Sequence, residues 1–255
     1  MPLFIKNRYL KVVGAVATGR KNMKKRIIAI GGGEIKNKTT LEIDRYIANL
    51  AKEHAGEKRA NALFIGTASH DSMPYFNSFR KTYTSVFDIK AEVALIVYGE
   101  MDVERIAGKI DAADCIYVGG GDTVFMLEKW AETGIDKLLI NAYNNGKIIC
   151  GLSAGAICWF EKMYTDYEIM RGQSSEYVLK DGLGILRGTM SPHFNEREKD
   201  YLFNLEKFGI TEAYGVENDC ALEFTDGKLT KVISAGGKAY IIRLENGKAV
   251  KTEIE

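Results

Sequence analysis

A serine stands between two glycines in the segment KIICGLSAGAICWF. Gly151, Ser153 and Gly155 satisfy the pattern G-x-S-x-G, in which the serine occupies a sharp turn between a strand and a helix. Residues 147–150 predict an apolar strand and residues 154–160 predict the start of a helix, so the required context is present. These residue types indicate that Ser153 is a nucleophile, with a turn that has no chemical role as the alternative.

A serine hydroxyl is a weak nucleophile and needs a general base, and the chain has three histidines. His54 ends an expected helix in the segment AKEHAGEK, where a solvated side chain is expected. His70 lies in the segment TASHDSMP after an expected strand, in a loop that is able to line a site. His193 follows a proline-marked turn after the strand-like run LGIL. Elimination favours His193 as the base and leaves His70 as the alternative.

The charge that develops on a substrate's carbonyl oxygen requires two hydrogen-bond donors about 3 Å away. The backbone N–H of Ala154, directly after the serine, is one candidate. The segment VGGGDT supplies Gly120 or Gly121 as the second, because glycine allows the backbone to approach closely. The same segment predicts a helix start that is capped by Asp122 or Thr123, and the two roles are compatible.

The elements that position these residues follow from the hydrophobic pattern. Apolar runs of strand length occupy residues 27–30, 62–65, 93–97, 115–118 and 148–150. Amphipathic stretches that predict helices occupy residues 40–54, 76–87, 101–112, 123–133 and 135–143. The strands are apolar throughout, as strands covered on both faces are. We therefore expect an α/β fold with a mostly parallel central sheet and helices on both faces.

The C-terminal segment has a different pattern. ALEFTDGKLTKVISAGGKAYIIRLENGKAVKTEIE contains strand-type runs separated by Asp-Gly, Gly-Gly and Asn-Gly, which are strong hairpin signals. We therefore expect a C-terminal antiparallel β meander. Three glycine-rich turns, IGGGEI, VGGGDT and CGLSAGA, fall at the carboxyl ends of expected strands, where such sheets bind ligands. None matches the dinucleotide or P-loop patterns.

The composition is that of an ordinary globular chain of 255 residues, 46% hydrophobic and 27% charged, with a net charge of +1. This charge creates no field that attracts nucleic acid or a membrane surface. The four cysteines form no CxxC pair, as is typical of reduced thiols in the cytoplasm. No His, Cys or Asp cluster has metal-ligand spacing. We therefore predict a cytoplasmic protein with no metal, no nucleic-acid partner and no membrane partner, and no pattern predicts its oligomeric state.

The first residues differ from the rest. Residues 1–22 contain no acidic side chain, and Met23 precedes the basic entry KKRIIAIGGG to the first expected strand. We therefore expect residues 1–22 to be an extension outside the fold, with an export signal as a weaker alternative. Residues 23–255 are expected to form a single catalytic domain.

Four segments occur in the order and spacing of the peptidase E family: CIYVGGGDTVFML, CGLSAGA, GLGILRGTMSPHFNE and YGVENDCALEF. Over residues 26–240 the chain resembles this family of aspartyl dipeptidases, which is related to cyanophycinase. The resemblance implies a fold like that of class I glutamine amidotransferases, Ser153 as nucleophile, His193 as base, a donor loop at residues 119–121 and no cofactor. It also implies that Arg197 binds the acidic side chain of the substrate, for which a guanidinium is well shaped; a surface helix charge is the alternative.

The third triad member is where the chain departs from the family. A glutamate of some members falls on Asn218. Because successive strand residues point to opposite faces, Glu217 and Asp219 are expected to share a face that Asn218 does not. We favour Glu217 as the triad acid. Asn218, Asp219, and the family's other candidate position near Asp166 and Glu168 remain alternatives.

The predicted function is hydrolysis of small peptides, in particular dipeptides with N-terminal aspartate, by a serine peptidase through an acyl-enzyme. The alternatives are a cyanophycinase-like β-aspartyl exopeptidase, an α/β-hydrolase-type esterase and a non-catalytic amidotransferase-like module. About 60 residues with a predicted β meander follow His193, whereas the histidine of an α/β-hydrolase lies late in the chain, which disfavours the esterase.

Overall fold

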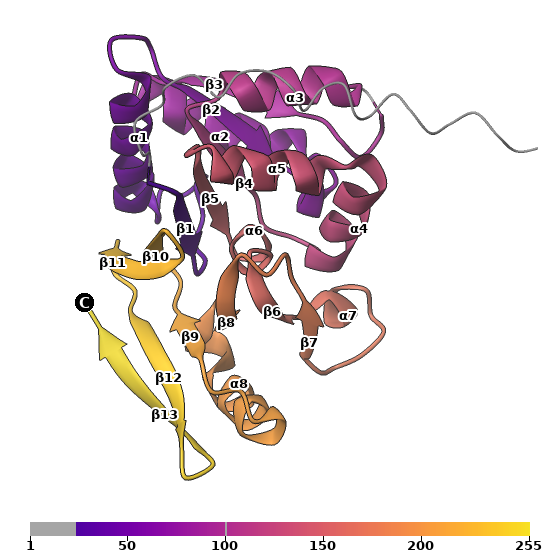
Figure 1. Ribbon diagram of the computed structural model, residues 1–255, viewed down its shortest axis with the longest axis vertical. Helices are drawn as coiled ribbons and strands as arrows, with labels where there is room; N and C mark the ends of the chain where they lie inside the picture. Colours follow the sequence, from indigo (N-terminus) through magenta and orange to yellow (C-terminus); the bar gives the residue numbers. More distant parts are fainter. Residues whose placement is uncertain (1–23, 100) are drawn as a thin grey trace, which may run out of the picture.

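The computed structural model describes residues 24–99 and 101–255 (Figure 1). The predicted extension of residues 1–22 lies outside the described residues. The described chain forms two β-sheets with helices packed against them. In Figure 1 the first sheet and its helices fill the upper half, and the second sheet lies below with the helix α8.

The first sheet has seven strands in the order β11-β10-β1-β5-β4-β2-β3. The strands are β1 (Arg26–Ile30), β2 (Asn61–Ile65), β3 (Lys90–Ala94), β4 (Cys115–Val118), β5 (Ile148–Leu152), β10 (Cys220–Thr225) and β11 (Lys228–Ser234). The five strands β1 to β5 are parallel, and β10 and β11 join the edge beside β1 as antiparallel strands. The prediction of a mostly parallel central sheet is confirmed.

Both faces of this sheet are buried, because helices cover each one. The helices are α1 (Leu41–Ala55), α2 (Met73–Ser85), α3 (Val103–Ala112), α4 (Thr123–Thr133) and α5 (Ile135–Asn144), and a short 3₁₀ turn, η1, spans Thr67–Ser69. Ile27 and Ala29 of β1 pack with residues of α3, α4 and α5, whereas Ile28 and Ile30 pack with residues of α1 and α2. Apolar side chains on both faces of β1 therefore fix the strand between two helical layers.

The second sheet has six strands in the order β13-β12-β9-β8-β6-β7. They are β6 (Phe160–Thr165), β7 (Val178–Asp181), β8 (Leu186–Ser191), β9 (Ala213–Val216), β12 (Ala239–Glu245) and β13 (Lys248–Ile254). The helices that follow β5 in the chain are α6 (Ala154–Ile157), α7 (Tyr167–Met170) and α8 (Phe194–Phe208). Tyr201 and Leu205 of α8 belong to the apolar cluster on the second sheet. The predicted antiparallel C-terminal strands are confirmed, and they divide between the sheets: β10 and β11 extend the first, β12 and β13 the second.

The topology brings distant segments to one place. Strand β5 lies between β1 and β4. The glycine-rich turns that follow these three parallel strands therefore lie side by side at the carboxyl ends of the strands. From the second sheet, β8 leads to His193 and β9 leads to Asn218. The predicted site residues can therefore come together at the carboxyl ends of strands from both sheets.

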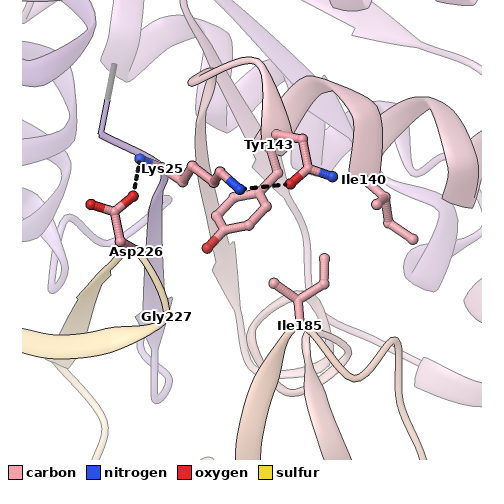
Figure 2. A pocket seen from close by; sticks show the side chains of 7 residues that line it. Lys25, Ile140, Tyr143, Ile185, Asp226 and Gly227 are labelled. Atoms are coloured by element: carbon pink, nitrogen blue, oxygen red, sulfur yellow. Dashed lines mark hydrogen bonds between the residues drawn. The ribbon is translucent and has the colours of Figure 1, made fainter. Parts of the chain in front are cut away.

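A cavity of about 350 Å³ lies at the opposite end of the first sheet, where Lys25 enters β1 (Figure 2). The Lys25 backbone N–H donates to Asp226 Oδ1 at 3.1 Å, and Lys25 Nζ donates to Asn144 Oδ1 at 3.1 Å. The remaining lining residues are Ile140, Tyr143, Ile185 and Gly227. The cavity is therefore lined without a nucleophilic thiol, an imidazole or an aliphatic hydroxyl, and its lysine is already engaged.

Within residues 24–99 and 101–255, each helix is too short or too polar to cross a bilayer.

Candidate active site

Ser153 occupies a strained turn between β5 and α6. Its φ is 51° and its ψ is −110°, and its backbone N–H donates to Ile30 O at 2.9 Å. A Cβ atom at Gly151 would lie 2.0 Å from the carbonyl oxygen of Gly155, so the motif's two glycines allow the chain to fold tightly on itself. The predicted strand–turn–helix context is present, although the helix is shorter than expected and ends at Ile157.

His193 lies beside this serine. It is the residue before α8, with a φ of 48°, and its backbone N–H donates to Gly31 O at 2.9 Å. His193 Nε2 is 3.0 Å from Ser153 Oγ, although the two residues are 40 positions apart in the chain. Both residues have a positive φ, which non-glycine residues rarely adopt, and such backbone strain is concentrated at functional sites.

Asn218 contacts the other nitrogen of this imidazole. His193 Nδ1 is 2.6 Å from Asn218 Oδ1, and Asn218 Nδ2 donates to Glu196 Oε1 at 2.7 Å. An ionised carboxylate can only accept hydrogen bonds, so Glu196 holds the NH₂ group and leaves the amide oxygen facing Nδ1. The neutral imidazole then carries its proton on Nδ1, and its Nε2 lone pair can accept the serine proton.

Glu217, the residue favoured as the triad acid, does not contact His193. Its carboxylate accepts from the Lys238 backbone N–H at 3.0 Å and from the Tyr240 hydroxyl at 3.3 Å. The strand alternation that favoured Glu217 does not apply here, because β9 ends at Val216 and the next residues form a turn before β10. Turn geometry, rather than the two-residue period of a strand, turns Asn218 toward the histidine.

The other acidic alternatives also bond elsewhere. Asp219 Oδ1 accepts from Thr39 Oγ1 at 2.5 Å, and Glu168 Oε1 accepts from the Tyr167 hydroxyl at 2.6 Å. Asp166 Oδ2 accepts from Arg197 Nη2 at 2.7 Å. The hydrogen bonds of these three carboxylates therefore give none of them the position that Asn218 occupies.

A cavity of about 550 Å³ opens onto Ser153 and His193. It is lined by residues of the turns after β1, β4 and β5 and of α2, namely Gly33, Glu34, Ile35, Lys36, Pro74, Tyr75, Ser78, Gly120, Gly121, Leu152, Ser153 and His193. This volume is in the range of pockets that hold small organic ligands, about 300–1,000 Å³. The cavity is thus large enough for a short peptide.

The predicted oxyanion donors lie at this cavity. A Cβ atom built on Gly120 would be 3.5 Å from Ser153 Cβ, so the glycine backbone runs alongside the serine. The Gly120 N–H points to the Tyr75 hydroxyl at 3.5 Å, a long contact that a substrate oxygen can replace. Gly121 lines the same cavity, and Ala154 follows the serine as the first residue of α6. No pattern in the sequence pointed to Tyr75.

Gly32 supports the site in a way that the sequence analysis missed. A Cβ atom at Gly32 would lie 2.0 Å from Asn218 Oδ1 and 2.5 Å from His193 Nδ1. No side chain larger than hydrogen therefore fits at this position while the histidine and the asparagine remain in contact. The glycine run IGGGEI after the first strand was the only sequence signal of this packing.

Arg197 is buried in α8, with a side-chain exposure of 7%. Its Nη2 binds Asp166, its guanidinium carbon lies 4.8 Å from the ring centroid of Tyr177, and its Nε has no hydrogen-bond partner among the described residues. Arg197 is not among the residues that line the cavity of Ser153. The expected alternative, a solvated surface charge, is therefore wrong for this side chain.

The remaining histidines lie outside the cavity. His54 Nδ1 is 2.9 Å from Asp114 Oδ1 and the His54 side chain is only 15% exposed, so the expectation of a solvated residue is wrong. His70 stacks on Phe125 with 4.1 Å between ring centroids. His193 is therefore the histidine that contacts Ser153.

The charge state of His193 reflects its surroundings. Burial lowers the pKa of the His193 imidazole below its ordinary value of 6.5, and the positive charge of Arg197 lowers it further. The hydrogen bond that Asn218 Oδ1 accepts from the imidazole and the negative charges of Glu196 and Asp166 raise this pKa. The imidazole is therefore neutral near pH 7 and is in the form that can accept a proton.

Comparison with known proteins places the chain in a family. The sequence profile of peptidase family S51 matches residues 27–232. The chain is 31% identical over 226 residues to the protein named uncharacterized peptidase YgaJ of Bacillus subtilis (strain 168), which covers 86% of this chain and 93% of that protein. It is 28% identical over 125 residues to peptidase E of Streptomyces coelicolor, which covers 48% of this chain and 49% of that protein.

The fold has a solved counterpart. The crystal structure of a peptidase from an acI-B1 Actinobacterium superposes with a TM-score of 0.64 and 18% sequence identity, covering 91% of this chain and 94% of that one. This likeness confirms the fold, and the resemblance of the sequence to peptidase E is confirmed by the family match. The chain is a peptidase hydrolase that belongs to peptidase family S51.

Proposed function

We propose that this protein is a serine-type peptidase that hydrolyses small peptides, with N-terminal aspartyl dipeptides as its preferred substrates. The observation that carries the proposal is the continuous contact from Ser153 Oγ to His193 Nε2, at 3.0 Å, and from His193 Nδ1 to Asn218 Oδ1, at 2.6 Å. These contacts support the proposal because a nucleophile, a base and an orienting group are the three parts of a serine hydrolase triad.

The proposed reaction uses residues that surround the cavity. Ser153 Oγ attacks the peptide carbonyl carbon while His193 Nε2 takes the hydroxyl proton, and the same proton then passes to the leaving amine. The N–H of Ala154, with that of Gly120 or Gly121, stabilises the oxyanion. Water, activated by His193, then hydrolyses the acyl-enzyme. Residues 23–255 act as one catalytic domain in this proposal.

Arg197 is proposed to bind the acidic side chain of the substrate. It follows His193 by one helical turn, and its unbonded Nε–H is a buried donor, which costs free energy unless a ligand satisfies it. Arg197 does not line the cavity of Ser153 and its Nη2 is bonded to Asp166, so a substrate carboxylate would have to displace Asp166 to reach the guanidinium. Preference for an α-aspartyl or a β-aspartyl bond follows from how the scissile carbonyl then meets Ser153.

The test is a substrate panel on matched variants. Wild type, Ser153→Ala, Arg197→Lys and the exposed control Arg187→Ala are assayed with Asp-Leu, Ala-Leu, β-Asp-Arg and a p-nitrophenyl ester. Wild type and Arg187→Ala are expected to prefer Asp-Leu, and Ser153→Ala is expected to lose activity on it by about 10⁴-fold or more. Arg197→Lys is expected to lose about 30-fold in kcat/KM on Asp-Leu, but not on Ala-Leu, because a buried charge-paired contact is lost.

Labelling with a fluorophosphonate probe distinguishes a wrong serine mechanism from a wrong substrate assignment. Labelling at Ser153 of the folded wild type supports the serine mechanism, and a folded protein that stays unlabelled overturns it in favour of a non-catalytic module. Preference for β-Asp-Arg over Asp-Leu would replace the dipeptidase assignment with that of a β-aspartyl exopeptidase. Activity on the ester with none on any peptide would replace both with an esterase.

A further inference from the structure

The first turn of α8 holds Asn218 at two points. Asn195 Oδ1 accepts from the Asn218 backbone N–H at 3.1 Å, and Glu196 Oε1 accepts from Asn218 Nδ2 at 2.7 Å. Asn195 and Glu196 directly follow His193 and Phe194, so one turn of helix carries both the histidine and the groups that fix its asparagine. Chain connectivity therefore ties the position of the imidazole to the position of the amide.

An asparagine beside His193 Nδ1 does not by itself meet two requirements of a group that orients the imidazole. An amide can present either its oxygen or its NH₂ group, and only the oxygen can accept the Nδ1 proton. An amide also carries no charge, so it stabilises the imidazolium of the transition state less than a carboxylate would. The Glu196 carboxylate meets both requirements, because it accepts from the NH₂ group and places a negative charge one amide away from the ring.

We propose that Glu196 is a positioning residue of the triad, which acts through Asn218 to hold the amide oxygen on His193 Nδ1 and to supply the negative charge that Asn218 lacks. This inference rests on the proposed serine-peptidase function. The side chains then form a hydrogen-bonded chain of Ser153, His193, Asn218 and Glu196. The Glu196 carboxylate touches neither the substrate nor the imidazole.

The electrostatic surroundings of His193 agree with this role. The charged groups around the imidazole are Arg197 and Glu196 from α8 and Asp166 from the segment before α7, with Glu34 and Lys36 of the turn after β1 at the same cavity. The negative charge of Glu196 raises the pKa of His193, against the lowering by burial and by Arg197. Removing that charge while keeping the hydrogen bond should therefore lower the pKa of His193 and leave its orientation unchanged.

The test compares Glu196→Ala with Glu196→Gln. Alanine removes the acceptor and lets the Asn218 amide rotate, so kcat on Asp-Leu and the rate of fluorophosphonate labelling are expected to fall about 10-fold to 100-fold, with KM unchanged. Glutamine keeps an oxygen acceptor, so both rates are expected to stay within about 3-fold of wild type at pH 8. The acid limb of the pH profile of labelling should move to lower pH in Glu196→Gln.

Two controls separate positioning from a general effect. Glu198→Ala removes a carboxylate of the same helix that pairs with Lys251 instead, and it should leave both rates unchanged. In an Asn218→Ala background, Glu196→Ala should cause little further loss, because the residue through which it acts is absent. The melting temperature of each variant shows whether the fold is retained.

Distinct results overturn the inference and the proposed function. If wild type is labelled at Ser153 and hydrolyses Asp-Leu while Glu196→Ala keeps both rates within about 2-fold, the positioning role is wrong and the serine mechanism stands. An equal loss in the Asn218→Ala background, or no shift of the acid limb in Glu196→Gln, also contradicts the role. If wild type is neither labelled nor active, the proposed function itself fails.

Discussion

His193 Nδ1 and Asn218 Oδ1 lie 2.6 Å apart, so an amide stands where many serine hydrolases have a carboxylate. Strands β8 and β9 are parallel neighbours in the second sheet. His193 follows β8 after Pro192, and Asn218 lies in the turn after β9, so the contact joins the ends of these two strands. It orients the imidazole without adding a charge to it.

The pH profile of wild type should have an acid limb below pH 6.5. Only neutral His193 can act as a base, so kcat/KM should fall as pH falls through the lowered pKa of this imidazole. Asn218→Asp in a Glu196→Gln background places a carboxylate against Nδ1 without setting it against the Glu196 carboxylate. The new charge raises the pKa of His193, so the acid limb should move to higher pH than that of Glu196→Gln alone. Measuring kcat/KM from pH 4.5 to 9 checks both expectations; an unchanged limb in the variant would show that another group controls the profile.

Gly32→Ala should abolish most activity while the protein still folds. Its Cβ atom would lie 2.0 Å from Asn218 Oδ1, so either the amide or the imidazole must move, and a displacement of about 1 Å is expected to cost about 100-fold in kcat. The measurement is kcat on Asp-Leu together with the melting temperature.

Gly108→Ala is the matched control. Gly108 lies in α3, where a Cβ atom would meet nothing within 4 Å. Alanine is better than glycine inside a helix by about 0.5–1 kcal/mol, so this variant should be slightly more stable and equally active. Full activity in Gly32→Ala would show that the space between the histidine and the asparagine is not limiting.

Asp44 should make the stability of the protein depend on pH. Its carboxyl is buried, accepts from Thr40 Oγ1 at 2.8 Å and from the Tyr83 hydroxyl at 3.1 Å, and burial raises its pKa from 3.8 to about 6. The unfolded state ionises first as pH rises, so the free energy of unfolding should fall between about pH 4 and pH 6, by at most about 3 kcal/mol, and stay lower above that range.

Asp44→Asn cannot ionise and should escape this loss. The difference in unfolding free energy, variant minus wild type, should therefore increase from pH 4 to pH 7 in urea titrations. Asp88→Asn is the control, because its side chain is 86% exposed, and its difference should stay near zero at both pH values. A difference for Asp44→Asn that is the same at pH 4 and pH 7 would contradict the prediction.

The four cysteines should resist alkylation in the native state. Cys115, Cys150, Cys158 and Cys220 are all buried free thiols. Burial raises the pKa of the Cys150 and Cys158 thiols well above the ordinary value and that of Cys220 to about 11, which suppresses the reactive thiolate. Mass spectrometry after iodoacetamide treatment at pH 8 should show no modification of these residues without denaturant and complete modification in guanidinium. Rapid native labelling of any of them would contradict the burial described here.

Sequence reasoning succeeded where the signal is local. The strand 115–118 and the helix 123–133 were predicted with the bounds that the structure gives to β4 and α4, because an uninterrupted apolar run precedes the capping residue Asp122. The G-x-S-x-G pattern also predicted the tight turn at Ser153, because its glycines are required by the backbone geometry itself.

Sequence reasoning failed where contacts between residues far apart in the chain determine the structure. The second sheet was not predicted, since β6 and β7 carry exposed residues and lack the apolar runs of the first sheet. Glu217 was favoured over Asn218 because the turn after β9 could not be distinguished from a continuing strand. His54 was assigned to solvent because its partner Asp114 lies 60 positions away in the chain.

The two sheets contribute different parts of the candidate active site: Ser153 follows a strand of the first, and His193 and Asn218 follow strands of the second. During synthesis the hydroxyl is made 65 residues before its last supporting side chain, Asn218. In the nascent chain the Ser153 hydroxyl therefore has neither His193 nor Asn218 beside it, and the contacts of this site form only when strands of both sheets are in place.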